Sequence, residues 1–598
     1  MFNLKKLFAG MSWGTPWKLA LQKRILVLEL CVVVGTLAGL ASSLMHTIAE
    51  WLHAHRTALF GSDARLAFWL EPALPALGIF FCVILTSLLW RRRPYETSLW
   101  IAIREARHPD RGMREYHAYS HILTSGVSVG MGISAGMEAP SALTGAAIGD
   151  NLGRKLGLPR ETRTLLLCAG AAAAIAGVFS APLAGALFAC EVLLPGSSAV
   201  TLIPLLIASA SGAIVSQMCG VNVHLPATDY AWHLKNLWLY ILVGLVCGLM
   251  SAAIIRLNCL SMALRRRIGS PWLVAAAGVL LLYAVFLLMP MVGGSGLDSV
   301  LEMMDGDYTT LQHGLLDIPD STGWLLVAGL ALCAFIKPIA SMISIQSGGD
   351  GGMFAPSLVT GAFLGACFHQ FLELGSITGF PLINCMAAGM AGVLAGVMHA
   401  PLTGLFLIAE LLGGYELFVP LMIVVALSSF TSKCLSRGNI YFAAAGLNRN
   451  SKREPWVSEC LDDCQDTPVG ELATRDLYAL APRDTFRTLL KVLMQSPQEI
   501  FPVLDKNGKL VGVIRERNLR PFLLDKSLYD ILVADDFMGP APVALPADAT
   551  LAEATRLFDT TGADFIPVAR DDGRFVGILT PGHILESHRS FLNHQDIF

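Results

Sequence analysis

The stretch Gly136-Met137-Glu138-Ala139-Pro140 decides the fold class, because it places a carboxylate in an apolar, glycine-rich run suited to a membrane. An acid at membrane depth is costly and usually serves a function. The same phrase returns 216 residues later without the acid: residues 136–149 and 352–365 are identical at nine of fourteen positions. A second match, between residues 169–191 and 388–410, follows at an offset of 219. Two ordered matches at nearly one offset indicate a duplicated unit.

The composition of the chain is that of a membrane protein. Of its 598 residues 54% are hydrophobic and only 15% charged, and the mean hydropathy is +0.57. The candidate spans are residues 25–43, 72–90, 165–194, 237–255, 272–289, 324–343, 386–412 and a shorter run, 419–429. Glycine and proline interrupt several of them, which favours a transporter or channel over a simple anchor. The net charge of −3 and the absence of a basic stripe argue against nucleic acid as a partner.

Basic residues predict the orientation in the membrane. They cluster before the first span and after the second, at Lys5, Lys6, Lys18, Lys23, Arg24 and residues 91–93. Because cytoplasmic loops are enriched in Lys and Arg, we expect a cytoplasmic N-terminus in a cell membrane, the inner membrane if the source is bacterial.

The last part of the chain has a soluble, α/β character. Here a repeat appears at an offset of 65, where residues 501–514 match residues 566–579. Each copy predicts a strand, a two-residue turn at Asn507-Gly508 or Asp572-Gly573, and a second strand, with helices on either side. In the polar segment before this repeat, Cys460 and Cys464 lack a second His or Cys pair, so we expect no metal.

The C-terminal repeat resembles a tandem of CBS domains, and together with the duplicated Gly-Met-Glu-Ala-Pro and Gly-Met-Phe-Ala-Pro motifs it resembles the CLC family of chloride channels and proton/chloride exchangers. The resemblance implies an all-α, multi-pass membrane domain built from an internal, inverted repeat, followed by an α/β CBS pair in the cytoplasm. It also implies a homodimer with one anion pathway per subunit. The expected segments are 1–24 (N-terminal segment), 25–447 (membrane domain), 448–467 (linker), 468–533 and 534–590 (CBS domains) and 591–598 (tail).

In nucleotide-binding CBS domains, a Thr or Ser after the second strand and an Asp three residues on contact the ligand. The corresponding residues here are Arg515 with Asn518, and Thr580 with His583. Since the acid is absent from both copies, Thr580 is the one candidate contact, and we expect no adenine nucleotide and no other cofactor.

The two glycine-rich motifs suit anion binding by backbone amides. Unpaired N–H groups and the helix dipole at a helix N-terminus stabilise an anion by about 0.3–2 kcal/mol each. Gly136 and Gly352 allow close approach to the backbone, while Pro140 and Pro356 in the first turn need no hydrogen-bond acceptor. The starts of these two helices can therefore converge on one ion near the midplane.

Glu138 then acquires a role as a gate, because a tethered carboxylate can occupy the anion site until it is protonated or displaced. The alternative is a buried structural acid. The resemblance assigns Glu138 to the gating and proton-accepting glutamate, Met353 and Phe354 to chloride-binding amides, and Tyr441 to a hydroxyl that contacts the ion. For Tyr441, a tyrosine at the membrane interface is the alternative.

The chain departs from the family at two places. Where many members have a serine that contacts chloride, spacing leads to Thr97 or Ser98, and which of them donates stays open. Exchangers commonly carry an internal proton-accepting acid at the position of Val192, as channel members do not.

We therefore expect a chloride channel, gated by Glu138 and dependent on voltage and pH, and not an enzyme. A proton/chloride antiporter is the alternative. A membrane-anchored CBS sensor and a fluoride or nitrate pathway are further hypotheses.

Overall fold

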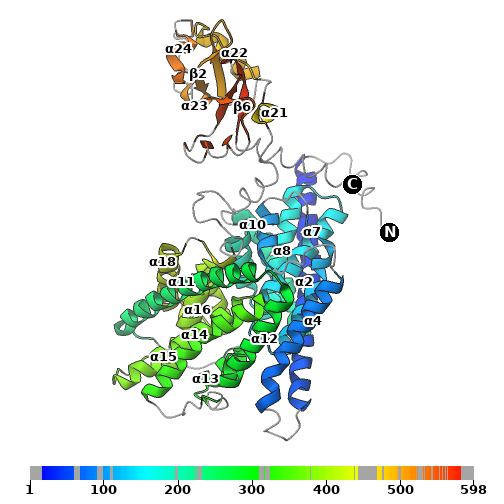
Figure 1. Ribbon diagram of the computed structural model, residues 1–598, viewed down its shortest axis with the longest axis vertical. Helices are drawn as coiled ribbons and strands as arrows, with labels where there is room; N and C mark the ends of the chain where they lie inside the picture. The colour runs from blue at the N-terminus through cyan, green and yellow to red at the C-terminus, as the bar shows by residue number, and fades with distance from the viewer. Residues whose placement is uncertain are drawn as a thin grey trace. The chain divides into compact units, whose positions relative to one another are not determined.

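The computed structural model divides the chain into two compact units, residues 1–445 and 446–598, each described by itself below (Figure 1). The structure describes residues 16–580 except 60–67, 90–97, 108–111, 195–198, 222–224, 226–231, 309–314, 317–322, 378, 437, 442–467, 475–476, 496–497, 499, 520–521, 523–528, 531, 541–542, 551–552, 555–556, 559–560, 562, 564 and 571. The predicted linker 448–467 with Cys460 and Cys464, the tail 591–598, Thr97 and His583 lie outside the described residues.

Helices joined by turns and loops make up the described part of the first unit. Its helices are α2 (Pro16–Leu59), η1 (Glu71–Ala73), α4 (Leu74–Leu89), α5 (Trp100–Arg107), η2 (Glu115–Ala118), α6 (Ser120–Gly130), α7 (Glu138–Lys155), α8 (Arg160–Phe179), α9 (Pro182–Phe188), η3 (Ala189–Leu193), α10 (Ala199–Met218), η4 (Leu234–Asn236), α11 (Leu237–Ile268), α12 (Pro271–Leu288), η5 (Pro290–Val292), α13 (Leu297–Met304), α14 (Trp324–Gln346), α15 (Phe354–Leu374), α16 (Leu382–Met398), α17 (Pro401–Leu411) and α18 (Phe418–Leu435). Among the described residues, eight helices are long and apolar enough to cross a membrane. The predicted multi-pass helical fold is confirmed.

Two of the predicted spans, residues 165–194 and 386–412, are interrupted between consecutive helices, α8 and α9 in the first and α16 and α17 in the second. The division falls at Ser180 and at His399, whose φ angles of 53° and 54° are left-handed and end α8 and α16. Pro182 and Pro401 then begin α9 and α17, where a missing N–H costs nothing. The same break at equivalent positions shows that the duplication extends to the backbone.

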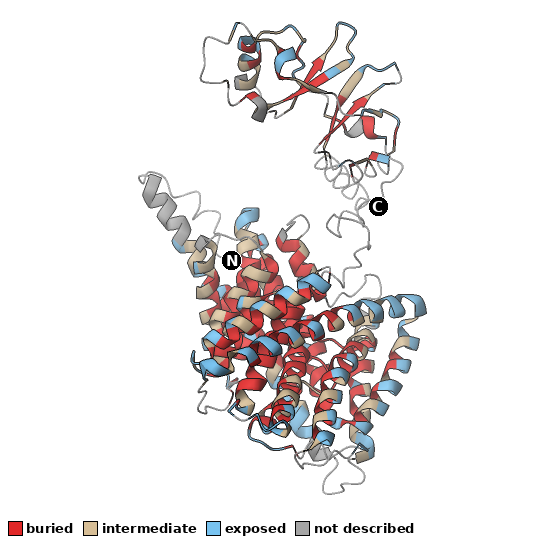
Figure 2. Cartoon of the chain, turned by 90° about the vertical axis from the view of Figure 1, so that its left-hand side faces the viewer, coloured by how far each residue is buried: buried red, intermediate tan, exposed pale blue. Residues whose placement is uncertain are grey.

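Small residues allow the helices of each half to pack closely. A Cβ atom on Gly145 of α7 would overlap the carbonyl oxygen of Gly170 of α8, and one on Gly361 of α15 would overlap that of Gly389 of α16. Figure 2 shows the resulting buried interior, with exposed residues gathered on the outer helices.

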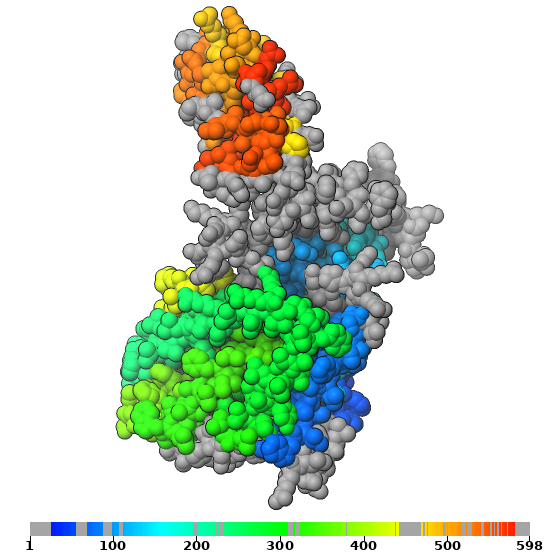
Figure 3. All heavy atoms as spheres, viewed as in Figure 1, coloured from blue at the N-terminus to red at the C-terminus, as the bar shows by residue number. Residues whose placement is uncertain are grey.

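The outer surface of this unit is apolar enough to contact lipid. Residues of α11 to α15, green in Figure 3, form most of the visible face of the unit. Large apolar side chains such as Leu249, Leu280 and Phe335 are 56%, 72% and 56% exposed. In a membrane, these side chains meet lipid chains and cost nothing to expose.

The described residues of the second unit form two three-stranded sheets. Its strands are β1 (Ile500–Leu504), β2 (Leu510–Arg515), β3 (Gly539–Pro540), β4 (Leu545–Pro546), β5 (Ile566–Ala569) and β6 (Phe575–Leu579), and its helices are α21 (Val469–Leu472), α22 (Phe486–Gln495), α23 (Glu516–Leu519) and α24 (Ala534–Phe537). The sheets have the orders β1-β2-β3 and β4-β5-β6; in these sheets the β4–β5 pairing is parallel and the other pairings between described strands are antiparallel. Lys509 and Arg574, which are equivalent at the offset of 65, form an antiparallel bridge between the two modules. The predicted α/β tandem is confirmed.

Candidate functional site: the convergence of two helix starts

Gly136 and Gly352 join the two halves of the membrane unit directly. The amide of Gly136 donates to the carbonyl of Gly352 at 3.0 Å, and the amide of Gly352 donates to the carbonyl of Gly136 at 2.8 Å. An antiparallel pair formed by two equivalent residues requires a local two-fold axis between them. The two motifs therefore meet in the opposite directions that an inverted repeat demands.

Both motifs continue at once into long buried helices. α7 begins at Glu138 and α15 begins at Phe354, so each start lies two residues from the bridge. A Cβ on Gly352 would come within 2.5 Å of the Cβ of Ala139, so only glycine allows this approach. The positive ends of two helix dipoles are thus held close together.

The Glu138 carboxylate occupies this place. The residue is 3% exposed, and its Oε2 lies where a Cβ on Gly136 would be, so the side chain folds back over the bridge. The backbone amides of Glu138 and Ala355, in the first turns of α7 and α15, are the hydrogen-bonding groups nearest the carboxylate. Oε2 itself is buried and has no hydrogen-bond partner of regular geometry among the described residues. A negative charge here is held by helix starts from both halves.

Tyr441 is a second buried polar residue near Glu138. The residue is buried, and its phenol is close enough to Glu138 for the two to interact electrostatically. Its Oη has no hydrogen-bond partner among the described residues. The backbone is fixed by Asn439, whose Oδ1 accepts from the Tyr441 amide at 3.1 Å. A buried hydroxyl without a partner costs about 1–3 kcal/mol, so this hydroxyl is free to donate to a further acceptor.

Comparison with known proteins agrees with this geometry. Residues 79–433 match the family model described as voltage-gated chloride channel, and residues 469–525 and 533–589 match the CBS domain. The chain belongs to the CLC family. The chloride channel ClcB of Salmonella typhi, described as voltage-gated and ClC-type, is 28% identical over 442 residues, covering 70% of this chain and 98% of the relative. The ClcB protein of Escherichia coli K12 is 29% identical over 432 residues, covering 69% and 97%.

Solved structures share the fold of this CLC chain. A slow cyanobacterial Cl-/H+ antiporter superposes with a TM-score of 0.58 at 21% identity, over 71% of this chain and 99% of the antiporter. A CLC-type fluoride/proton antiporter gives 0.57 at 22%, over 72% and 99%. A eukaryotic CLC transporter gives 0.60 at 19%, over 94% and 98%. At such identities the likeness shows the fold alone.

The remaining predicted anion contacts of this CLC chain lie in different settings. Met353 and Phe354 are buried at the start of α15, where backbone amides lack helical partners. The Phe354 ring packs against Phe179 and Phe188, with ring centres 5.5 and 6.1 Å away. Ser98 is exposed, and its hydroxyl accepts from the Trp100 amide at 3.2 Å at the start of α5. Ser98 as a chloride donor stays a prediction.

Val192 is buried, and its neighbour Glu191 has a structural task that the sequence analysis missed. The two Glu191 oxygens accept from the amides of Leu402 and Thr403, at 2.9 and 2.7 Å, at the start of α17. Glu410 returns the contact, accepting at 2.9 Å from the amides of residues 183 and 184 at the start of α9. Each half thus caps a helix of the other. In the sequence, the only sign of a shared role was that Glu191 and Glu410 occupy equivalent positions at the offset of 219.

Three further polar residues, which the sequence analysis also missed, are linked inside the membrane unit of the CLC chain. His117 Nδ1 lies 3.2 Å from His121 Nε2, and His121 Nδ1 lies 2.8 Å from Asp350 Oδ2. All three residues are at most 2% exposed. Asp350 stands two positions before Gly352, so the linked residues end next to the bridge between the halves.

Lys337 is also buried in the membrane unit, but it is surrounded by backbone carbonyls and not by other titratable side chains of the linked group above. It is 0% exposed, and its Nζ donates to the carbonyls of Val292, Gly293 and Gly294 at 3.1, 3.3 and 2.9 Å. Carbonyls at the end of the short η5 helix are thereby satisfied. We interpret Lys337 as a cap that fixes the turn between α12 and α13.

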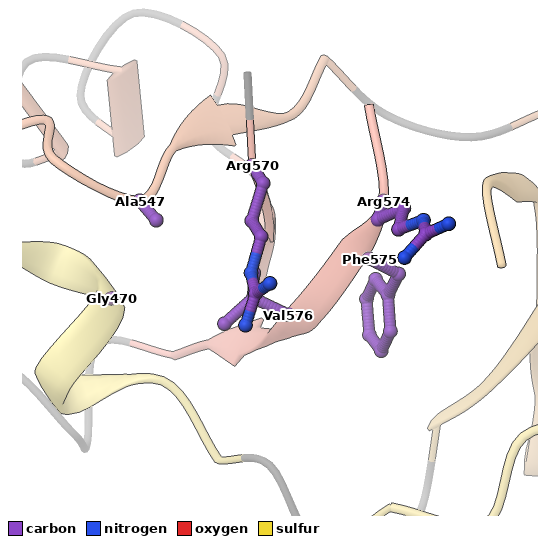
Figure 4. Close-up of a pocket in the computed structure, with 6 residues that line it drawn as sticks. All are labelled: Gly470, Ala547, Arg570, Arg574, Phe575 and Val576. Atoms are coloured by element: carbon purple, nitrogen blue, oxygen red, sulfur yellow. The ribbon is translucent and has the colours of Figure 1, made fainter. Parts of the chain in front are cut away.

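A pocket of about 290 Å³ lies between Gly470 of the first CBS match and residues of the second (Figure 4). Its lining residues are Gly470, Ala547, Arg570, Arg574, Phe575 and Val576. Thr580, directly after β6, is partly buried and is not among them. The predicted nucleotide contact and this pocket are therefore formed by different residues.

Proposed function

We propose that this CLC chain transports chloride across a membrane through a pathway gated by Glu138. One observation carries the proposal: a buried carboxylate lies at the starts of α7 and α15, near the buried Tyr441 hydroxyl, which has no partner among the residues that the structure describes. Groups that hold a carboxylate there can hold a chloride ion instead. Because both are anions, the carboxylate and chloride compete for the place, and protonating or displacing Glu138 opens it.

We infer that the pathway works as a channel, without stoichiometric proton exchange. Support comes from Val192, an apolar residue where exchangers commonly carry the internal acid. Glu191 is a poor substitute, because both its oxygens already accept hydrogen bonds from α17. Proton/chloride antiport is the second candidate, favoured by the buried His117, His121 and Asp350, which offer titratable groups elsewhere.

The wider setting is part of the same proposal. We propose a homodimer in a cell membrane, with the N-terminus and the CBS pair in the cytoplasm, supported by the basic residues before the first span. Chloride is the principal ion, and fluoride or nitrate is kept as an alternative because of the altered serine motif at residues 96–100. The proposed function involves no enzymatic activity, no metal and no bound adenine nucleotide.

Flux in proteoliposomes tests the proposal. Glu138→Gln should carry chloride at all pH values with no response to protons, since a neutral side chain cannot compete as an anion. The matched control is Glu302→Gln, an exposed acid on α13, which should behave as the unaltered protein. A folded Glu138→Gln protein without chloride flux would contradict the gate. The reversal potential under crossed chloride and proton gradients separates channel from antiporter.

A further inference from the structure

The strongest unexplained feature is the line of hydrogen bonds from His117 through His121 to Asp350. A carboxylate only accepts, so His121 Nδ1 carries the proton it shares with Asp350. In neutral His121 the other nitrogen, Nε2, then accepts from His117 Nδ1–H, 3.2 Å away. Both N–H donors therefore point toward Asp350. With this orientation, a proton added at His117 can be passed through both hydrogen bonds to Asp350.

The surroundings hold these groups in place and add few charges. Asp350 Oδ2 also accepts from the Thr124 hydroxyl, and its carbonyl accepts from Ser128 at 3.0 Å. From α4, the Cys82 thiol faces Asp350 and donates to the Thr124 carbonyl at 3.2 Å. The charged group that faces His117 is Arg114, and the ring beside it is that of Tyr116, with centres 4.2 Å apart.

One end of the line adjoins the surface of the membrane unit. His117 is buried within η2, but Arg114, Glu115 and Tyr119 around it are exposed. Glu115 lies 3.8 Å from Lys155 at the last residue of α7. Since Glu138 is the first residue of the same helix, Lys155 is about 25 Å along α7 from the gate.

The other end approaches the gate. Asp350 is two residues from Gly352, which is bonded to Gly136, and Glu138 is two residues farther on. Extended chain lengths and the spacing of a bridged pair put the Cα atoms of the two acids at most about 20 Å apart. Asp350 Oδ1 is buried and has no hydrogen-bond partner among the described residues, so this oxygen of the carboxylate is open to a water molecule that exchanges protons with it.

We propose that His117, His121 and Asp350 form a proton relay that serves the Glu138 gate from the α7 C-terminal side of the membrane unit. A hydronium ion gives a proton to His117 Nε2, and the Nδ1 proton of His117 passes to His121 Nε2. The Nδ1 proton of His121 then passes to Asp350, which becomes a neutral acid. Water in the anion pathway carries that proton from Asp350 to Glu138. Each imidazole, left with its proton on Nε2, then regains its starting tautomer by taking up a proton from water at Nδ1 and releasing the one at Nε2.

This inference rests on the proposed gate and holds for either mode of transport. In a channel the relay makes opening respond to pH on one side of the membrane, and in an antiporter it carries the exchanged proton. The chain then lacks the internal acid that exchangers commonly carry at the position of Val192, but it retains a path for protons through the relay.

The test uses the full chain in proteoliposomes, with chloride flux recorded while pH is varied on one side at a time. His121→Gln and Asp350→Asn keep hydrogen-bonding groups but cannot relay a proton. Each should reduce the pH response from one side at least about tenfold and leave the response from the other side intact. The matched control is His369→Gln, because His369 on α15 binds the Phe380 carbonyl at 2.9 Å outside the relay.

A Glu138→Gln background separates a relay from a purely structural network. There His121→Gln should change chloride flux less than twofold, because the gate no longer needs protons. Loss of flux in the double variant would show that the network positions Gly352, and would overturn the relay. An unchanged pH response in His121→Gln, or a parent protein without any pH response, would overturn it as well. Failure of Glu138→Gln alone to conduct would instead refute the gate.

Discussion

Replacing Glu410 with Gln should weaken the membrane fold and leave the anion pathway chemically unchanged. Both Glu410 oxygens accept backbone N–H groups, those of residues 183 and 184, at 2.9 Å. Glutamine keeps one carbonyl acceptor, but it turns an NH₂ group toward the second amide and removes the negative charge at the start of α9. Glu191→Gln makes the equivalent change at the start of α17.

The expected loss of stability in each variant follows from these contacts. A hydrogen bond to a charged acceptor contributes about 1.5–3 kcal/mol, and the favourable charge at a helix start adds about 0.3–1 kcal/mol. Both acids are partly exposed, so water compensates some of the loss. We expect each variant to lower the free energy of unfolding by about 1.5–3 kcal/mol. Since α9 and α17 pack on each other, the two effects should not add simply.

Equilibrium unfolding in detergent micelles measures the change, with Glu416→Gln, an exposed acid, as the matched control. Anion selectivity and the pH response of flux should survive in the folded fraction of both variants. If Glu191→Gln unfolded like the parent and lost its pH response, Glu191 would be a proton station and the capping argument would be wrong.

Three other results are expected. Gly145→Ala should destabilise the fold by about 1–3 kcal/mol, because its Cβ meets the Gly170 carbonyl, whereas Gly414→Ala, with open space around it, should be nearly neutral in the same unfolding assay. Tyr441→Phe should weaken chloride binding about fivefold, the value of one hydrogen bond of about 1 kcal/mol, and unchanged affinity by calorimetry would exclude its hydroxyl from the site. Removing the residues after 465 should alter assembly or gating with ion selectivity retained, and altered selectivity in a folded truncation would contradict this.

The sequence alone was enough to predict those features that depend on residues close together in the chain. The duplication is visible as identity at offsets of 216 and 219, and the glycines and prolines of the motifs mark helix starts. The lone Glu138 stands out because acids are rare in apolar runs. Each of these signals lies within a few residues, and the structure has helices starting at both motifs.

Contacts between the halves could not be predicted in the same way. His121 and Asp350 are 229 residues apart, and nothing local to either residue indicates the other. Glu191 and Glu410 were visible as equivalent acids, but a direct repeat and an inverted repeat give the same alignment. Only the inversion brings each acid to the other half's helix start, so the capping role required the structure.

The two halves of the membrane unit carry different side chains next to the bridge that joins them. Glu138 and Phe354 occupy equivalent positions, next to a bridge that treats Gly136 and Gly352 alike. Two carboxylates at one buried site would repel each other, and one would take up a proton to remain there. With Phe354 packed among aromatic rings, the second half contributes amides but no charge. The symmetric scaffold therefore holds one carboxylate at the bridge, and in the proposed function this carboxylate is the group that competes with chloride.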